Sequence, residues 1–183
     1  TDSAYVLFDL DHTLDKKRPY WVCKVVAAHM KQVDKYTIEG YRILTGWARL
    51  RKVYFVAKFD KPIQQSVFVN GKRIFSGANL INGNAAKAAF RFNTNKNNTV
   101  QMKVALSATS IEDAYKNMTA ELPDWNFEKV RTDAKNAWNK ELSQIEITDD
   151  NQENLTKFYT ALYHTKIQPN IFQDVNGDYL GLD

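Results

Sequence analysis

The sequence predicts a mainly β protein, an antiparallel β-sandwich that is followed by helices. In residues 4–106, short apolar runs are broken by turn residues, and only the stretch Ala27–Val33 shows any helical periodicity. Strands that follow one another without intervening helices favour antiparallel pairing, because parallel pairs need long crossover connections. After Leu106 the apolar residues recur every three or four positions, which predicts helices. The change near Ser107 marks a domain boundary or a linker.

Short apolar segments bounded by turn residues predict the strands. The best-defined connection is a hairpin at Asn70-Gly71, because this pair accepts the positive φ angles of a two-residue type I′ turn. Pro62 ends the preceding strand, since proline cannot donate to the ladder. The polar run 93–99 is expected to form an exposed loop. The expected strands are Ala4–Leu10, Trp21–Ala28, Tyr36–Leu44, Val53–Phe59, Gln65–Val69, Arg73–Phe75, Lys87–Asn93 and Val100–Leu106.

Helices are expected in the last third of the chain. Ser110 can cap a helix that continues to Leu122, and Pro123 stops it. Asp124 can cap a longer helix whose apolar residues recur as far as Ile145. A further helix is expected from about Gln152 to His164. Its inward stripe is formed by Leu155, Phe158, Tyr159, Leu162 and Tyr163.

Composition excludes several classes of protein. At 183 residues the chain suits one domain or slightly more, and its apolar share of 44% is that of a globular protein. No window approaches the roughly 20 apolar residues of a membrane span. The formal charge of +4 is spread along the chain, and the one compact basic run is Lys16-Lys17-Arg18, so we expect no nucleic-acid partner. A single cysteine, Cys23, excludes an internal disulfide framework and cysteine-based zinc clusters.

The run Asp9-Leu10-Asp11-His12-Thr13 resembles the first motif of haloacid dehalogenase-type phosphatases. In that chemistry Asp9 would attack phosphorus and Asp11 would act as the acid and base. Gly177-Asp178 with Asp183 can be read as the distal acidic motif of the same family. The context opposes this hypothesis, because such a fold alternates strands and helices in a parallel sheet, whereas the residues after Thr13 predict strand after strand. The phosphatase stays a remote alternative.

Six blocks in order carry a second resemblance. They are Ile38–Ala48, Val53–Pro62, Lys103–Ala114, Trp125–Glu128, Ala137–Leu142 and Phe158–Asp183. With these blocks at plausible spacing, the chain resembles the bacterial α-mannosidases of glycoside hydrolase family 92 over nearly its whole length. The resemblance implies an N-terminal β-sandwich of the supersandwich type, linker helices and an (α/α)6 barrel, with the active site between the two domains.

This resemblance divides the chain into three parts. Residues 1–106 are expected to be part of the N-terminal sandwich domain, and residues 107–148 a helical linker. Residues 149–183 are expected to begin the catalytic barrel, which is incomplete here.

The resemblance also implies an activity. These enzymes are calcium-dependent inverting exo-α-mannosidases that remove terminal, mostly α-1,2-linked mannose from glycans. An inverting enzyme holds a general acid and a general base about 6.5–9.5 Å apart. The resemblance places both carboxylates and the calcium ligands downstream of Asp183, so no catalytic or metal-binding residue is assigned in this chain. The chain alone is therefore expected to be inactive. The alternative function is a stand-alone carbohydrate-binding β-sandwich.

Four residues are candidates for contact with substrate. Trp47 and Tyr41 offer aromatic rings on which an apolar sugar face can stack. Arg42 offers a bidentate fork for a hydroxyl pair or a carboxylate. Asp183 lies nearest the expected barrel. For each aromatic ring the competing interpretation is core packing at a strand end, and for Arg42 it is an ordinary exposed strand residue.

Two other polar features have structural interpretations. Asp174, Asn176 and Asp178 resemble the spacing of a calcium loop, but no carboxylate follows at the bidentate position, so an Asx turn is expected. His164 can either reach across a domain interface or cap the C-terminus of its helix.

The expected partners are mannose-containing glycans, with neither nucleic acid nor membrane. With no barrel to cover it, the apolar stripe of the last helix would be exposed, which predicts self-association or pairing with a chain that carries the barrel. The family implies a secreted, periplasmic or cell-surface location in a bacterium, although the chain shows no signal peptide.

Overall fold

The structure is a computed structural model that describes residues 2–13, 23–46, 49–95 and 98–181. Within these ranges the chain forms nine strands followed by three helices. The strands are β1 (Ser3–Asp9), β2 (Lys24–Gln32), β3 (Thr37–Thr45), β4 (Arg51–Phe59), β5 (Ile63–Asn70), β6 (Arg73–Ser76), β7 (Leu80–Gly83), β8 (Ala86–Asn93) and β9 (Met102–Ser107). The helices are α1 (Ile111–Glu121), α2 (Phe127–Leu142) and α3 (Gln152–Thr165).

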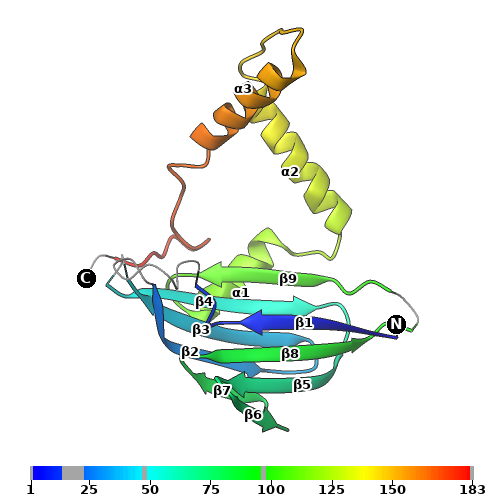
Figure 1. Cartoon of the computed structure of the whole chain (residues 1–183), viewed down its shortest axis with the longest axis vertical. Coiled ribbons are helices and arrows are strands. Elements are labelled where there is room, and N and C mark those ends of the chain that lie inside the picture. Colours follow the sequence, from blue (N-terminus) through cyan, green and yellow to red (C-terminus); the bar gives the residue numbers. More distant parts are fainter. Residues whose placement is uncertain (1, 14–22, 47–48, 96–97, 182–183) are drawn as a thin grey trace. The chain divides into compact units, whose positions relative to one another are not determined.

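The strands form two sheets that pack face to face (Figure 1). The four-stranded sheet has the order β1-β8-β5-β6, and the five-stranded sheet has the order β7-β2-β3-β4-β9. Every strand pair in the described residues is antiparallel. The predicted antiparallel sandwich followed by helices is therefore confirmed. The parallel sheet that a haloacid dehalogenase-type phosphatase needs is not what these residues build.

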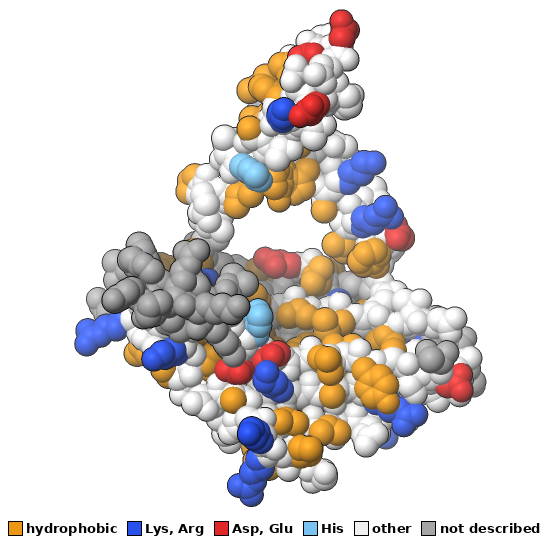
Figure 2. Space-filling model, viewed as in Figure 1, with side chains coloured by type: hydrophobic (Ala, Val, Ile, Leu, Met, Phe, Trp, Pro, Cys, Tyr) orange, Lys and Arg blue, Asp and Glu red, His pale blue; other side chains and the backbone are white. Residues whose placement is uncertain are grey.

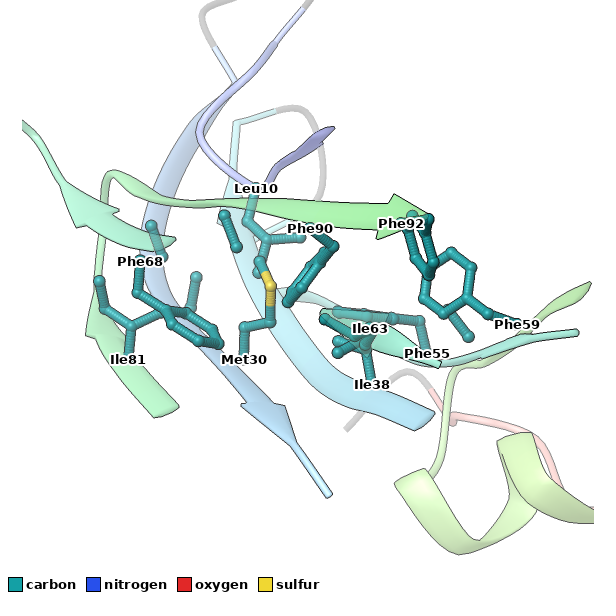
Figure 3. Packing of buried hydrophobic residues seen from close by; sticks show 14 residues of the cluster. Leu10, Met30, Ile38, Phe55, Phe59, Ile63, Phe68, Ile81, Phe90 and Phe92 are labelled. Atoms are coloured by element: carbon teal, nitrogen blue, oxygen red, sulfur yellow. The ribbon is translucent and has the colours of Figure 1, made fainter. Parts of the chain in front are cut away.

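The core lies between the two sheets and is rich in phenylalanine (Figure 3). Phe90 and Phe92 of β8 are fully buried because alternate residues of a strand point to the same face. They meet Phe55 and Phe59 of β4 in the opposite sheet, and the rings of Phe59 and Phe92 are 4.7 Å apart. Truncation of one such ring to alanine typically costs about 3–5 kcal/mol. This ring cluster holds the two sheets together.

The strand expected over Trp21–Ala28 is β2, which extends to Gln32, and its first expected residues, 21 and 22, lie outside the described part. The weak helical period at Ala27–Val33 was misleading, because Ala28 and Met30 alternate into the core as strand residues do. Strand β7 was not predicted. It is four residues long and pairs with β2.

The predicted hairpin at Asn70-Gly71 is present, but its predicted turn type was wrong. Asn70 pairs with Arg73, so the two loop residues are Gly71 and Lys72. Gly71 has a φ of 60°. Every described residue with a positive φ is a glycine, so Lys72 does not have one. A positive φ at the first loop residue alone is the pattern of a type II′ turn.

Helix α1 packs on the outer face of the five-stranded sheet. Ala114 and Met118 of the helix form a small buried cluster with Val56 of β4 and Ala105 of β9. The N-cap is Ser110, as predicted, and its hydroxyl accepts a hydrogen bond from the backbone N–H of Asp113. Apolar contacts along one face of α1 therefore hold the helix on the sheet, and a local cap completes its N-terminus.

Helices α2 and α3 belong to a second compact unit, Asn126–Phe172. The N-cap of α2 is Asn126 and not the expected Asp124. The rings of Trp138 on α2 and Tyr163 on α3 have centroids 4.5 Å apart. Neither helix contains a buried residue, because this unit is a pair of helices with no third layer in the described structure.

Candidate functional site

The outer face of the five-stranded sheet carries a ladder of aromatic rings around Tyr41. His29 of β2, Tyr41 of β3 and Tyr54 of β4 are directly paired across neighbouring strands. The His29 and Tyr41 rings are stacked with centroids 5.6 Å apart, and Tyr41 lies 5.8 Å from Tyr54. His29 Nδ1 donates to Asn82 Oδ1 of β7 at 2.7 Å. Tyr41 is therefore part of a half-buried, hydrogen-bonded surface and not of the core.

Arg42 points to the other face of the same strand, because successive side chains of a strand alternate. Its Nη1 donates to the carbonyl oxygen of His12 at 2.9 Å. The structure therefore does not bring Arg42 together with Tyr41. The other two candidates, Trp47 and Asp183, lie outside the described residues.

The acidic pair at the end of β1 forms a local turn. Asp9 Oδ1 accepts hydrogen bonds from the backbone N–H groups of Asp11 and His12 at 2.9 and 3.0 Å, and Lys87 Nζ donates to Asp9 Oδ2 at 2.9 Å. Partial burial alone would raise the pKa of Asp9, but the hydrogen bonds and the charge of Lys87 outweigh it and lower that pKa. A carboxylate engaged by a lysine and two amides is a strand-end cap, which explains this motif without phosphatase chemistry.

A buried carboxylate lies where the segment after α3 returns to the sandwich. Asp174 is 5% exposed and sits against the end of β9 and the first turns of α1. Its Oδ2 accepts from Ser107 Oγ at 2.8 Å and from Thr109 Oγ1 at 2.5 Å, and its Oδ1 accepts from Asn117 Nδ2 at 2.7 Å. Asn117 Oδ1 in turn accepts from the backbone N–H of Val175 at 2.9 Å. We call these residues the Asp174 clamp.

A second carboxylate borders the Asp174 clamp. Hydrogen bonds from Ser110 Oγ and Lys116 Nζ hold the pKa of Asp113 well below its ordinary value, together with the Thr109 hydroxyl, whose one hydrogen is shared between Asp113 Oδ2 and Asp174 Oδ2. Asp113 Oδ1 also accepts from Asn176 Nδ2 at 3.0 Å. The loop at residues 174–178 is closed by its own hydrogen bonds, including one from the Gly177 N–H to the Asp174 carbonyl oxygen.

The Asp174 clamp does not fit a calcium ion. Calcium takes six to eight oxygen ligands, whereas both carboxylates here already accept from hydroxyl, amide or ammonium donors. The described residues contain no group of three or more histidine, cysteine, aspartate or glutamate side chains that could hold a metal ion. This network joins two parts of the chain.

His164 lies in the last turn of α3. Its ring is 5.7 Å from that of Tyr163. Asp174 was considered from the sequence only as part of a turn. Its burial was missed because its partners lie 57–67 residues away, and no local pattern signals a contact of that range.

Two family models match the chain in succession. Residues 1–107 match the model described as the glycosyl hydrolase family 92 N-terminal domain. Residues 113–183 match the model described as the glycosyl hydrolase family 92 catalytic domain.

Solved structures give the same result. The chain is 32% identical to a family GH92 alpha-mannosidase from Bacteroides thetaiotaomicron, with a TM-score of 0.85. That match covers 99% of this chain and 24% of the enzyme, so the chain spans about a quarter of its relative's length. The same enzyme has also been solved in complex with mannoimidazole. An inverting GH92 mannosidase from the same species is 21% identical, with a TM-score of 0.81 over 97% of this chain and 23% of that one, and shares the fold.

A curated relative comes from the fungus Arthroderma benhamiae. It is described as an uncharacterized secreted glycosidase and is 34% identical over 93 residues. The match covers 49% of this chain and 12% of the relative.

Proposed function

Because the chain belongs to glycosyl hydrolase family 92, we propose that it is part of an exo-α-mannosidase that removes terminal mannose from glycans. The observation that carries the proposal is the match to a solved α-mannosidase, which is 32% identical and aligns with 99% of this chain. The mannoimidazole complex of that enzyme supports a mannose-shaped substrate. From the family resemblance, we propose that the mannose removed is α-1,2-linked and that hydrolysis inverts the configuration of the released sugar.

We further propose that these 183 residues alone do not hydrolyse mannosides. The chain spans 24% of the length of the solved relative. The resemblance assigns the general acid, the general base and the calcium ligands to residues after Asp183, and the carboxylates of the Asp174 clamp are already held by protein donors. The role proposed for this part is therefore to supply the sandwich and to hold the segment after α3.

Substrate contact is proposed for Tyr41, Arg42, Trp47 and Asp183. Tyr41 and Arg42 lie on opposite faces of β3, so they would act at different places if both contact sugar. Tyr41 has the His29 and Tyr54 rings beside it, which fix its orientation.

The test compares two proteins on α-1,2-mannobiose. The 183-residue chain is expected to release no mannose above a buffer control, with or without calcium. A protein that contains the whole family 92 catalytic domain is expected to release mannose with inversion and to lose activity when a chelator removes calcium. Full-rate turnover by the 183-residue chain, or no turnover by the longer protein, would refute the proposal.

We also propose a secreted, periplasmic or cell-surface location in a bacterium. The curated fungal relative is described as secreted. Among the helices that the structure describes, none is long and apolar enough to cross a membrane.

A further inference from the structure

We propose that the outer face of the four-stranded sheet carries a second, non-catalytic sugar site, at a polar pocket between β1, β8 and β5. The pocket has a volume of about 500 Å³. Ligand pockets are typically about 300–1,000 Å³. It is lined by Asp2, Gln64, Gln65, Arg91, Asn93 and Asn95. Figure 2 views the molecule on this face of the sheet.

The register of the sheet aligns a row of side chains on this face. Tyr5 of β1 pairs with Arg91 of β8, and Arg91 pairs with Gln65 of β5. Directly paired residues on one face have Cβ atoms about 4.5–5.5 Å apart. Phe90 and Phe92, the neighbours of Arg91 along β8, are buried in the core, so Arg91 and its partners point outward. An exposed ring, a guanidinium and an amide therefore stand side by side.

A β-bulge adds a second amide to the row. The register of β5 against β8 shifts between Ile63 and Gln65, which leaves Gln64 as the extra residue. A bulge opposes two residues of one strand to one of its partner and so re-aims side chains. Gln64 and Gln65 are both exposed and both line the pocket. The sheet irregularity thus gathers two carboxamides beside one arginine.

These groups suit the hydroxyls of a neutral sugar. Each carboxamide offers an acceptor and two donors, and the guanidinium offers a fork of donors, whereas sugar hydroxyls both donate and accept. Arg91 Nε donates to Ser3 Oγ at 3.0 Å, which orients the guanidinium, and within the described residues this is its one hydrogen bond. Arg91 and Asp2 balance in charge, which favours a neutral ligand over a polyanion.

Tyr5 supplies the apolar contact that sugar binding needs. Its side chain is 64% exposed on the same face and next to Arg91. Aromatic rings with one apolar face and one polar tip suit surfaces that bind partly polar ligands. Tyr5 does not line the pocket itself, but its pairing with Arg91 places its ring beside the lining residues. The ring, the amides and the arginine together are the reason why we assign this pocket to a glycan. The preference for mannose rests on the proposed function, whereas the sugar class rests on the pocket.

The test titrates the 183-residue chain at millimolar concentrations of α-1,2-mannobiose, and separately of cellobiose, with amide chemical shifts read by NMR. Shifts are expected at Arg91, Gln64 and Gln65. Arg91→Ala and Tyr5→Ala are expected to weaken binding about tenfold or more. Their matched controls, Arg51→Ala on the other sheet and Leu7→Ala further along β1, are expected to leave it unchanged. Far-ultraviolet dichroism verifies that each variant is folded.

Several results would overturn the site. These are the absence of shifts with either sugar, shifts that cluster at Tyr41 on the other sheet, or equal loss of binding in the control variants. A variant that changes the oligomeric state and not sugar binding would assign the pocket to a protein contact and overturn it as well. Binding of cellobiose in place of mannobiose at these residues would support the site and count against the mannose specificity of the proposed function. Mannosidase activity of the longer protein without sugar binding by this pocket would overturn the site alone.

Discussion

Replacement of Asp174 by alanine should release the segment after α3 from the sandwich. The carboxylate accepts from Ser107 Oγ, Thr109 Oγ1 and Asn117 Nδ2. The two hydroxyls remain 2.9 Å apart and can pair with each other. Asn117 Nδ2 keeps one N–H on the Leu106 carbonyl oxygen at 2.8 Å, and its second N–H loses its acceptor. The loss is then about 1 kcal/mol for each hydrogen bond, or about 3 kcal/mol in all.

Asp174→Asn should cost less. Its side-chain oxygen can still accept from Asn117, and its NH2 group can donate to hydroxyls that rotate to accept. We expect a loss of about 1 kcal/mol, equivalent to one hydrogen bond. The ratio between the two variants separates the effect of hydrogen bonding from that of side-chain volume.

Native-state hydrogen exchange measures this effect where it arises. The amide of Val175 donates to Asn117 Oδ1 and that of Gly177 to the Asp174 carbonyl oxygen, so both report docking of the segment. A loss of about 3 kcal/mol should speed their exchange by about a hundredfold in Asp174→Ala. Asp133→Ala removes an exposed carboxylate on α2 and serves as the control, with an expected change below about 0.5 kcal/mol. Unchanged exchange at both amides in Asp174→Ala would refute the clamp.

Three further predictions concern stability and association. Gly40→Ala should lower the urea midpoint by the equivalent of about 2–3 kcal/mol, because a Cβ there would lie 2.2 Å from the His29 carbonyl oxygen. The control Gly181→Ala, where a Cβ would meet open space, should leave the midpoint unchanged, and equal midpoints of the two variants would contradict the prediction. Because the pKa of Asp113 is lowered in the folded state, its carboxylate adds to the free energy of unfolding above its unfolded pKa of about 4, and this contribution is lost as the pH falls toward the folded pKa. The loss of stability in acid should therefore be shallower in Asp113→Asn, and identical acid titrations of the two proteins would count against it. Tyr163 of α3 is 39% exposed and should make the chain self-associate through this helix, so Tyr163→Ser should weaken the association in sedimentation velocity. A monomer at high concentration would contradict this prediction.

The succession of strands and helices along the chain was predictable, because the alternation of buried and exposed residues is a local signal. In β2 the buried Ala28 and Met30 alternate with less buried neighbours, and β8 shows the same alternation along its whole length. Strand β7 escaped prediction because its four residues include Asn82 and Gly83, which are typical of turns, and its pairing depends on β2. The turn type at Gly71 was missed because two loops were possible: one with Asn70 and Gly71 as its two residues, and one with Gly71 and Lys72. Only the pairing of Asn70 with Arg73 selects the second.

The candidate site was less predictable, since its contacts are distant in sequence. Tyr41 and Arg42 are neighbours in the chain, and once β3 is a strand the alternation rule sends them to opposite faces. That rule could have been applied to the predicted strand. The bulge at Gln64 could not have been foreseen, because the register of β5 against β8 depends on packing of both strands on the core.

The Asp174 clamp also shows how the two family domains are coupled within this chain. Ser107 lies at the end of the N-terminal match, whereas Asn117 and Asp174 lie in the catalytic match. Their hydrogen bonds cross that boundary, and the segment Gln173–Asp183 groups with the sandwich and not with α2 and α3. The hydrogen bonds therefore continue across the boundary between the two family matches near Ser107. A buried carboxylate with three donors instead anchors the catalytic-domain chain on the sandwich, which gives the sandwich a positioning role in the proposed mannosidase.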